Sequence, residues 1–303
     1  MGPAPPADLP SLEALLREAE HLVRAPVSPQ DARVDLDDPR IVSVFDDLPL
    51  WSAPFALRLL ERVRLRPRMC VLDLGCGAGF PLVELAERLG PTCCAVGVDP
   101  WLSGLRRARG KAVWREVAQA HLVCGVGEAL PLADASVDLV VSNNGLNNVR
   151  DVSVTLAEVR RVTRPGAQLV ATMNLPETMA AFYAAFEATL VELGQPERIE
   201  TLRRHVHEKR KPVALTRASL AAAGFAVESE TFDAFDWRFL DARALFAHSF
   251  IRLGFLEPWQ AVVPEQDRAG AFALLGARLD RLAAERGELR LGIPFVCFDC
   301  RRL

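Results

Sequence analysis

The stretch that decides the fold is Val71-Leu72-Asp73-Leu74-Gly75-Cys76-Gly77-Ala78-Gly79-Phe80-Pro81. An apolar run leads into three glycines at alternate positions, and a segment with helical periodicity starts at Pro81. Glycine permits positive φ and lets the backbone approach a ligand, and the first N–H groups of a helix favour a carboxylate or phosphate. We expect a ligand-binding loop here, although a tight turn without a ligand would use the same glycines.

Short apolar runs alternate with helical patterns on both sides of this loop. Strands are expected at residues 69–74, 95–98, 121–124, 137–142 and 168–173, and helices at 81–89, 102–118 and 151–162, the last capped by Asp151. A turn is expected at 164–166. This alternation indicates βαβ units. The predicted fold class is α/β, a doubly wound, mostly parallel seven-stranded Rossmann-like sheet with helical insertions over its carboxyl edge.

The remaining segments are mainly helical in pattern. Helices are expected at 11–23 and 54–65, from Pro176 to 193, and at 216–223, 241–253 and 265–285, with strands at 225–232 and 293–298. We therefore expect an N-terminal tail and helical lid at 1–65. Residues 66–303 are expected to form the main domain, with helical insertions at about 175–213 and 241–288.

Composition bounds the class of protein. The chain has 303 residues with 50% hydrophobic content, a net charge of −3 and a pI near 6.0. These values are typical of a globular protein and argue against a dedicated nucleic-acid binder. No run of 18 apolar residues predicts a membrane span, and the first residues lack the basic and apolar regions of a signal peptide. Most of the seven cysteines lie in apolar runs, so we expect reduced thiols and a cytoplasmic location.

A Cys-x-x-Cys motif, Cys297-Phe298-Asp299-Cys300, lies near the end of the chain. A zinc site needs a second pair of ligands, and no nearby cysteine or histidine supplies one. In the predicted strand the two thiols point to opposite faces. No metal is expected.

A second acidic residue supports a ligand at the glycine loop. Asp99 ends the apolar run that begins at Val96, 26 residues after Asp73. An acidic residue at the tip of the second strand can accept both hydroxyls of a ribose, although capping the next helix is the alternative. Pro100 and Trp101 follow and can form an apolar wall for adenine. Dinucleotide-binding loops read Gly-x-Gly-x-x-Gly, whereas this loop reads Gly-x-Gly-x-Gly.

The pattern Asp-Leu-Gly-Cys-Gly-Ala-Gly at 73–79 resembles the first motif of class I S-adenosylmethionine-dependent methyltransferases. The segments at 125–132, 136–142 and 161–170 are similar to later motifs of that superfamily, in the same order. The resemblance covers about residues 69–174 and is strongest to the ubiquinone/menaquinone-type small-molecule branch. It implies S-adenosylmethionine as cofactor, S-adenosylhomocysteine as product and a small-molecule acceptor.

The resemblance also implies cofactor contacts. Gly75, Gly77 and Gly79 would line the methionine part, Asp73 would orient its amino end and Asp99 would bind the ribose hydroxyls. The family usually has Asp, which accepts from the adenine N6 amine, where this chain has Val126. A backbone carbonyl near Gly127, the side chain of Glu128, or packing alone can replace that contact.

Further site residues are expected at the carboxyl edge of the sheet, where ligands of open α/β sheets bind. Asn143 and Asn144 follow the fourth strand, and Asn174 follows the fifth. We expect Asn143 to contact the methionine amine and Asn144 and Asn174 to contact substrate. The alternative is that asparagines here serve turns and left-handed positions.

Four other residues are candidates for substrate contact or proton transfer. His205 and His207 lie in a charged run, 198–211, and either is a candidate general base. Their i, i+2 spacing suits one face of a strand but not of a helix. Tyr183 falls on the apolar side of a predicted helix, where core packing is the alternative to substrate contact. Trp51 precedes the first strand and is a candidate lid residue, with an ordinary packing role as the alternative.

The sequence therefore predicts methyl transfer to a small-molecule acceptor by in-line displacement. Two alternatives stay open: an RNA or protein methyltransferase that uses the basic run at 203–211, and a non-catalytic S-adenosylmethionine-binding protein.

Overall fold

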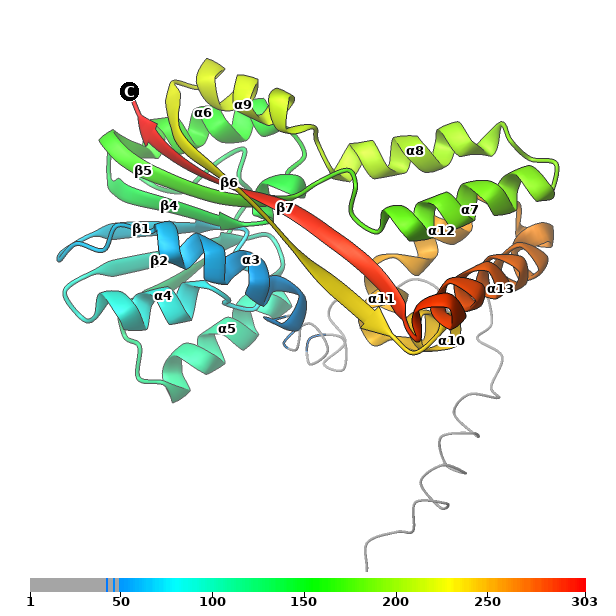
Figure 1. Ribbon diagram of the computed structural model, residues 1–303. Helices are drawn as coiled ribbons and strands as arrows, with labels where there is room; N and C mark the ends of the chain where they lie inside the picture. Colours follow the sequence, from blue (N-terminus) through cyan, green and yellow to red (C-terminus); the bar gives the residue numbers. More distant parts are fainter. Residues whose placement is uncertain (1–41, 43–45, 47–48) are drawn as a thin grey trace, which may run out of the picture. The chain divides into compact units, whose positions relative to one another are not determined.

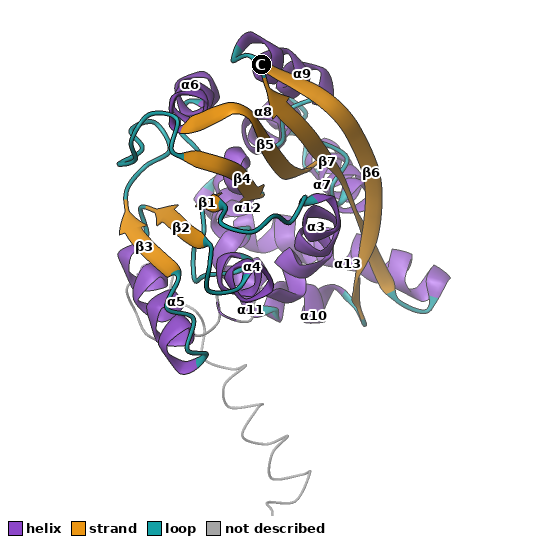
Figure 2. Cartoon of the chain, turned by 90° about the vertical axis from the view of Figure 1, so that its left-hand side faces the viewer, coloured by secondary structure: helices purple, strands orange, loops and turns teal. Residues whose placement is uncertain are grey.

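The structure is a computed structural model that describes residues 42, 46 and 49–303, all of which belong to one compact unit. The helix expected at 11–23 and the N-terminal tail lie outside the described residues. The predicted fold class is confirmed: the sheet has seven strands in the order β3-β2-β1-β4-β5-β7-β6, and β7 alone runs opposite to the other six. Figure 2 shows the strands side by side in this order.

The strands follow the predicted apolar runs because a strand of a parallel sheet is buried on both faces. Their bounds are β1 Cys70–Leu74, β2 Cys94–Asp99, β3 Ala120–Cys124, β4 Val137–Asn143, β5 Thr163–Asn174, β6 Phe225–Phe239 and β7 Leu289–Arg302. Strands β1, β2, β4 and β5 are parallel, so their carboxyl ends meet at one edge of the sheet. The glycine loop and Asp99 both lie at that edge.

Helices cover both faces of the sheet (Figure 1). On one face lie α3 Pro49–Arg62, α4 Leu82–Leu89 and α5 Leu102–Trp114; on the other lie α6 Val152–Val162 and α9 Val213–Ala222. Asp151 caps α6 as predicted, because its side chain accepts from the N–H groups of Ser153 and Val154. The first face packs through Leu59 of α3, and the second through Leu156 of α6. The core is thus two apolar layers around one sheet.

Strands β6 and β7 extend past the carboxyl edge as a two-stranded ribbon. Asn174, the last residue of β5, pairs with Phe295, whereas β6 and β7 continue to pair as far as Phe239 and Leu289. The remaining helices gather around the far end of this ribbon (Figure 1). They are α7 Ala180–Glu192, α8 Arg198–Lys209, α10 Ala242–Ala247, α11 Ser249–Gly254, α12 Leu256–Ala261 and α13 Arg268–Arg286.

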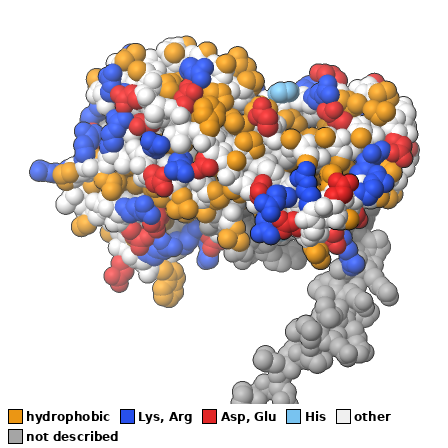
Figure 3. All heavy atoms as spheres, viewed as in Figure 1, with side chains coloured by type: hydrophobic (Ala, Val, Ile, Leu, Met, Phe, Trp, Pro, Cys, Tyr) orange, Lys and Arg blue, Asp and Glu red, His pale blue; other side chains and the backbone are white. Residues whose placement is uncertain are grey.

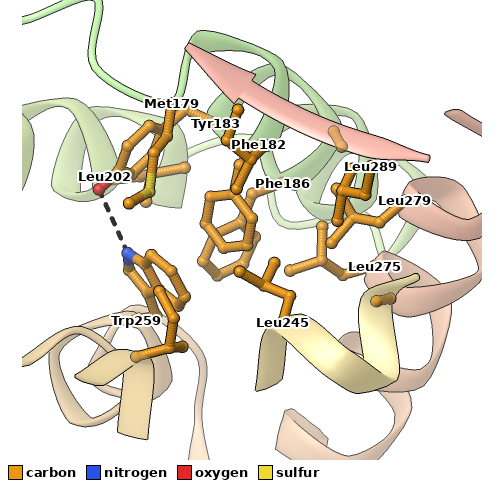
Figure 4. Packing of buried hydrophobic residues seen from close by; sticks show 14 of the residues in the cluster. Met179, Phe182, Tyr183, Phe186, Leu202, Leu245, Trp259, Leu275, Leu279 and Leu289 are labelled. Atoms are coloured by element: carbon orange, nitrogen blue, oxygen red, sulfur yellow. Dashed lines mark hydrogen bonds between the residues drawn. The ribbon is translucent and has the colours of Figure 1, made fainter. Parts of the chain in front are cut away.

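This helical part has its own apolar core (Figure 4). Phe182 of α7 stacks on Trp259 of α12, with ring centroids 4.0 Å apart, and both side chains are fully buried. Leu275 and Leu279 of α13 complete the cluster from the other side. The insertions are therefore a packed layer at the carboxyl edge.

Several predicted boundaries differ from the structure. The turn expected at 164–166 lies within the bounds of β5, at a point where its register with β4 shifts. The helix expected from Pro176 begins only at Ala180, and the helix expected at 241–253 is divided into α10 and α11 at His248. The strand expected at 225–232 continues to Phe239, because outward-facing charged residues alternate with the aromatic residues of the ribbon.

The two cysteines of the Cys-x-x-Cys motif lie on opposite faces of the sheet, as predicted. Cys297 packs in the cluster beneath α3, whereas Cys300 packs in the cluster on the opposite face of the sheet. No group of histidine, cysteine and acidic residues in the described chain is arranged to hold a metal ion. Among the described helices, none has the length and apolarity needed to cross a bilayer.

Candidate functional site

The glycine loop after β1 is fixed against the tip of β2. The N–H of Gly75 donates to the carbonyl of Val98 at 2.9 Å, and the N–H of Gly79 donates to the carbonyl of Cys76 at 2.8 Å. All three glycines have positive φ, with values of 78°, 50° and 92° for Gly75, Gly77 and Gly79. The sequence uses glycine here because other residues rarely adopt this conformation.

The surroundings of these glycines differ. A Cβ on Gly79 would lie 2.8 Å from the Cβ of Ala108, so that glycine permits α5 to pack closely. A Cβ on Gly75 would lie 3.0 Å from the Cα of Gly145. A Cβ on Gly77 would meet nothing within 4 Å. The open side of the loop is therefore at Gly77.

Asp99 joins the loop to the second strand. Its Oδ2 accepts from the N–H of Gly77 at 2.8 Å, and its Oδ1 accepts from the N–H of Trp101 at 2.8 Å. Burial raises the pKa of Asp99, and the two backbone N–H donors offset part of that rise. Each carboxylate oxygen has a second lone pair, so both can still accept a hydroxyl. Asp99 thus accepts from Trp101, the residue that caps α5, but is not itself the helix cap that the alternative predicted. It keeps the capacity to bind a ribose.

Asp73 is the anomaly of the site. Its side chain is fully buried, and neither carboxyl oxygen has a hydrogen-bond partner among the described residues. Burial raises its pKa to about 8, and the charge of nearby Asp99 adds to the rise. The backbone N–H of Leu82 is near the carboxyl without the geometry of a hydrogen bond, and it offsets a little of the rise. A buried, unpaired carboxyl is costly. Its position beside the open loop is therefore suited to a cationic ligand group.

The neighbours of the expected adenine site have structural partners. Trp101 lies flat on the first turn of α5, where a Cβ on Gly104 would lie 2.3 Å from the indole ring. Glu128 accepts through Oε1 from the N–H groups of Arg150 and Asp151, at 2.7 and 3.0 Å. Pro100 is exposed beside Trp101, so both can offer an apolar surface.

Val126 and Gly127 precede Glu128 in the same segment. Val126 is 44% exposed, and its side chain offers apolar contact only. A Cβ on Gly127 would lie 2.9 Å from a side-chain carbon of Thr155, so this glycine is needed for packing on α6.

Three asparagines at the carboxyl edge, Asn144, Asn147 and Asn174, are joined by hydrogen bonds. Asn144 has φ of 60°, and its Oδ1 accepts from the backbone N–H of Asn174 at 3.1 Å. Asn147 donates to the side-chain oxygens of both residues, at 3.3 and 2.6 Å. Asn143 donates to the carbonyl of Ser52 at 3.2 Å. The structure thus brings the predicted residues together, in a network that positions the β4 and β5 loops.

Two residues that the sequence analysis missed support this edge. Ser142 is fully buried; its hydroxyl donates to the carbonyl of Leu74 at 3.0 Å and accepts from the N–H of Leu146 at 3.2 Å. A Cβ on Gly145 would lie 2.2 Å from the carbonyl oxygen of Leu74. The glycine loop and the β4 loop therefore touch. Only the Ser-Asn-Asn-Gly spacing after an apolar run hinted at this contact.

Trp51 lies at the start of α3, where the Ser52–Asn143 hydrogen bond holds that helix to the end of β4. Its ring contacts five aromatic rings at centroid distances of 5.0 to 6.1 Å. Trp237, at the shortest of these distances, belongs to the β6–β7 ribbon. The residue therefore links α3 to the helical insertions at the carboxyl edge.

The remaining candidates lie in the insertion. Tyr183 is buried, and its hydroxyl accepts from Nε1 of Trp259 at 3.2 Å, as its packing alternative predicted (Figure 4). His205 and His207 lie on α8 rather than on a strand. Two residues apart on a helix are about 200° apart around its axis. Accordingly His205 is half-buried and His207 is exposed, and the two do not share a face.

Comparison with known proteins finds methyltransferases. A family model described as a methyltransferase domain matches residues 72–171. A malonyl-[acyl-carrier protein] O-methyltransferase of Halorhodospira halophila is 36% identical over 51% of this chain and 51% of that protein. A demethylmenaquinone methyltransferase of Lactococcus lactis is 29% identical over 50% of this chain and 59% of its own length. The chain thus spans about half the length of these two relatives.

Two matches cover more of the chain. Nocamycin O-methyltransferase of Saccharothrix syringae is 26% identical over 78% of this chain and 87% of that protein. The crystal structure of a putative methyltransferase from Bacillus halodurans has a TM-score of 0.56, covers 82% of this chain and 99% of its own, and is 15% identical. Residues 72–171 therefore match a methyltransferase domain, in the same region as the motifs that carry the resemblance.

Proposed function

We propose that this protein transfers the methyl group of S-adenosylmethionine to a small-molecule acceptor. The observation that carries the proposal is Asp73, a fully buried carboxyl with no hydrogen-bond partner among the described residues, beside a loop whose open side is at Gly77. The amino group of S-adenosylmethionine is a cation that can donate hydrogen bonds, which is the kind of partner that the Asp73 carboxyl lacks. The Bacillus halodurans structure supports the fold alone, whereas the names of the three relatives point to methyl transfer.

The chain's residues fit the cofactor from its amino end to its ribose. Asp73 would hold the ammonium group, and the N–H groups at the start of α4 would favour the carboxylate. Asp99 retains lone pairs for the ribose hydroxyls. Pro100, Trp101 and Val126 would hold adenine by packing, with the backbone near Gly127 as an acceptor for its amine.

The same geometry suits a displacement reaction. S-adenosylmethionine, when bound, supplies a methyl group on a cationic sulfur, and S-adenosylhomocysteine remains after transfer. The protein's task is to align the acceptor and to exclude water. The helices around the β6–β7 ribbon lie beyond the carboxyl edge and can perform both tasks (Figure 1). Asn144 and Asn174 would border the acceptor there.

A base is needed only where the acceptor carries a proton. Of the two predicted histidines, half-buried His205 remains the candidate, since His207 is exposed on another face of α8.

The charged run at 203–211 supports a small molecule over RNA. Arg203 is paired with Glu187 at 2.8 Å, and Arg210 is buried. Figure 3 shows acidic and basic side chains next to one another over α7 and α8. A nucleic-acid site needs an unbroken basic surface.

The proposal is tested with methyl-labelled S-adenosylmethionine and a cell extract divided by ultrafiltration. We expect label in the small-molecule fraction with wild type and strong loss of that label with Asp99→Ala. Label in the RNA or protein fraction, dependent on Asp99, would contradict the small-molecule assignment. No Asp99-dependent label in any fraction would contradict catalysis.

A further inference from the structure

A buried arginine lies at the end of α8. Arg210 is 4% exposed. Within the described chain its side chain makes a hydrogen bond and a cation–π contact: Nη1 donates to the carbonyl of Thr178 at 3.3 Å, and Cζ lies 5.3 Å from the ring centroid of Tyr183. No ion pair joins it to any acidic side chain that the structure describes. The other N–H groups of the guanidinium thus have no acceptor among those residues.

Two hydroxyl groups near Arg210 are also incompletely satisfied. Thr178 is fully buried, and its Oγ1 has no hydrogen-bond partner within the described chain. The hydroxyl of Tyr183 accepts from Trp259 (Figure 4), but no described residue accepts its proton. Arg210 adjoins both residues, through the Thr178 carbonyl and the Tyr183 ring, so a positive charge and two hydroxyl groups with unused protons lie on neighbouring side chains.

An unpaired buried cation is unfavourable, since arginine is rarely buried without a partner. The location adds to the cost. Thr178 lies just before Met179, the cap of α7, and the start of a helix carries partial positive charge. An anion is therefore the ligand that this cluster lacks.

The cluster lies close to the carboxyl edge along the chain. Thr178 is four residues after Asn174, and four residues span at most about 14 Å even when fully extended. The turn between them is fixed to β7, because the N–H groups of Leu175 and Met179 donate to the carbonyls of Pro294 and Gly292 at 2.9 and 2.8 Å. A ligand held at Arg210 would thus have one end within a small molecule's length of the edge.

We propose that Arg210, Thr178 and Tyr183 bind an oxyanion group, and that this group belongs to the methyl acceptor. The planar guanidinium suits a carboxylate or a phosphate, which it can bind through two parallel hydrogen bonds. The fully buried rings of Phe182 and Trp259 adjoin Tyr183, so an apolar body attached to the oxyanion suits these surroundings better than a polar one. The assignment to the acceptor rests on the proposed function, whereas the anion site itself does not.

Isothermal titration of the full chain with benzoate and, separately, with inorganic phosphate tests this site. We expect saturable binding of benzoate to wild type, weakened at least tenfold in Arg210→Met. Arg204→Met is the matched control, because it removes one positive charge from an exposed position of the same helix. It should change the affinity less than twofold. Equal benzoate affinity in wild type and Arg210→Met, or none in wild type, would overturn the site. Tighter binding of phosphate than of benzoate would contradict the proposed apolar body of the ligand, and the proposed oxyanion site would stand.

Thr178→Val is a second variant for the case in which Arg210→Met does not fold. It removes the unpartnered hydroxyl with little change of shape. We expect benzoate affinity to fall severalfold while the melting temperature does not fall. Unchanged affinity in this variant would overturn the role of Thr178. Titration of the same samples with S-adenosylhomocysteine separates the two proposals, because failure to bind it contradicts the proposed function and leaves the benzoate result standing.

Discussion

Asp99 accepts a hydrogen bond from the backbone N–H of Gly77 at 2.8 Å, so the tip of the second strand and the open point of the glycine loop form one unit. The other oxygen of Asp99 accepts from Trp101, which begins the turn into α5. The loop cannot move without breaking these bonds. This fixed geometry supports the proposed binding of the cofactor's nucleoside at the loop.

Asp99→Ala should weaken the binding of S-adenosylhomocysteine by about 1–3 kcal/mol, because the ribose hydroxyls lose their acceptor. Calorimetric titration at constant pH measures the change. Asp134→Ala, which removes an exposed carboxylate paired with Arg161, is the matched control and should leave the affinity unchanged. Equal affinities for wild type and Asp99→Ala would exclude the proposed role of Asp99.

Asp73 should make the ligand-free protein less stable as pH rises. Its pKa in the folded protein is about 8, above its ordinary value of 3.8, so the folded state holds this proton more tightly than the unfolded state. The contribution of this group to the free energy of unfolding is fully present below pH 4 and is lost as the pH rises from about 4 to 8. Between pH 5.5 and 7.5, the free energy of unfolding of wild type should fall by about 2–3 kcal/mol relative to Asp73→Asn. Parallel pH profiles from denaturant unfolding would contradict this.

The same carboxyl should couple ligand binding to proton release. An ammonium group favours the ionised form of Asp73, which carries a proton at pH 7 in the ligand-free protein. We expect S-adenosylhomocysteine binding to release close to one proton at pH 7, measured by calorimetry in two buffers of different ionisation enthalpy. Asp73→Asn should release none. Proton uptake by wild type would refute the linkage.

Gly77 and Gly79 should respond differently to alanine. Gly79→Ala places a Cβ 2.8 Å from Ala108 at φ of 92°, so we expect a loss of about 2–4 kcal/mol in unfolding free energy. Gly77→Ala has open space around it and should cost only about 1 kcal/mol of stability. Its Cβ should instead lower S-adenosylhomocysteine affinity at least tenfold. Loss of stability without loss of affinity in Gly77→Ala would mean that the open side does not face the ligand.

His205→Ala and His207→Ala separate the two base candidates once an acceptor is in hand. Because His207 is exposed, His207→Ala should leave kcat unchanged. His205→Ala should lower kcat by at least about 100-fold, because it removes the general base. The pH profile of kcat should lose its acidic limb in His205→Ala. Full activity in both variants would remove histidine from the mechanism.

The sequence predicts the central strands well because buried parallel strands are short apolar runs with polar ends. It also places the glycine loop, Asp99 and the asparagines correctly at the carboxyl edge. The errors lie where local pattern is overridden by packing. The run 198–211 contains few apolar residues, so its helix was not expected. Residues 233–239 continue β6 because they pair with β7 along the whole of this stretch.

The sequence did not predict which individual side chains are buried or lack partners. Nothing in the run from Arg203 to Lys211 distinguishes Arg210, which is buried, from Arg204, which is exposed. Likewise Asp73 stands in the motif that carries the resemblance, but its lack of a hydrogen-bond partner among the described residues depends on how the chain packs around it. Both features are the ones on which the functional proposals depend.

A crystal structure of the protein grown with S-adenosylhomocysteine tests the central claim most directly. We predict the amino group of the ligand within hydrogen-bond distance of Asp73 and its ribose hydroxyls on Asp99, with the sulfur facing the carboxyl edge. A structure in which protein side chains fill the space beside Gly77, or in which a dinucleotide occupies it, would contradict the account.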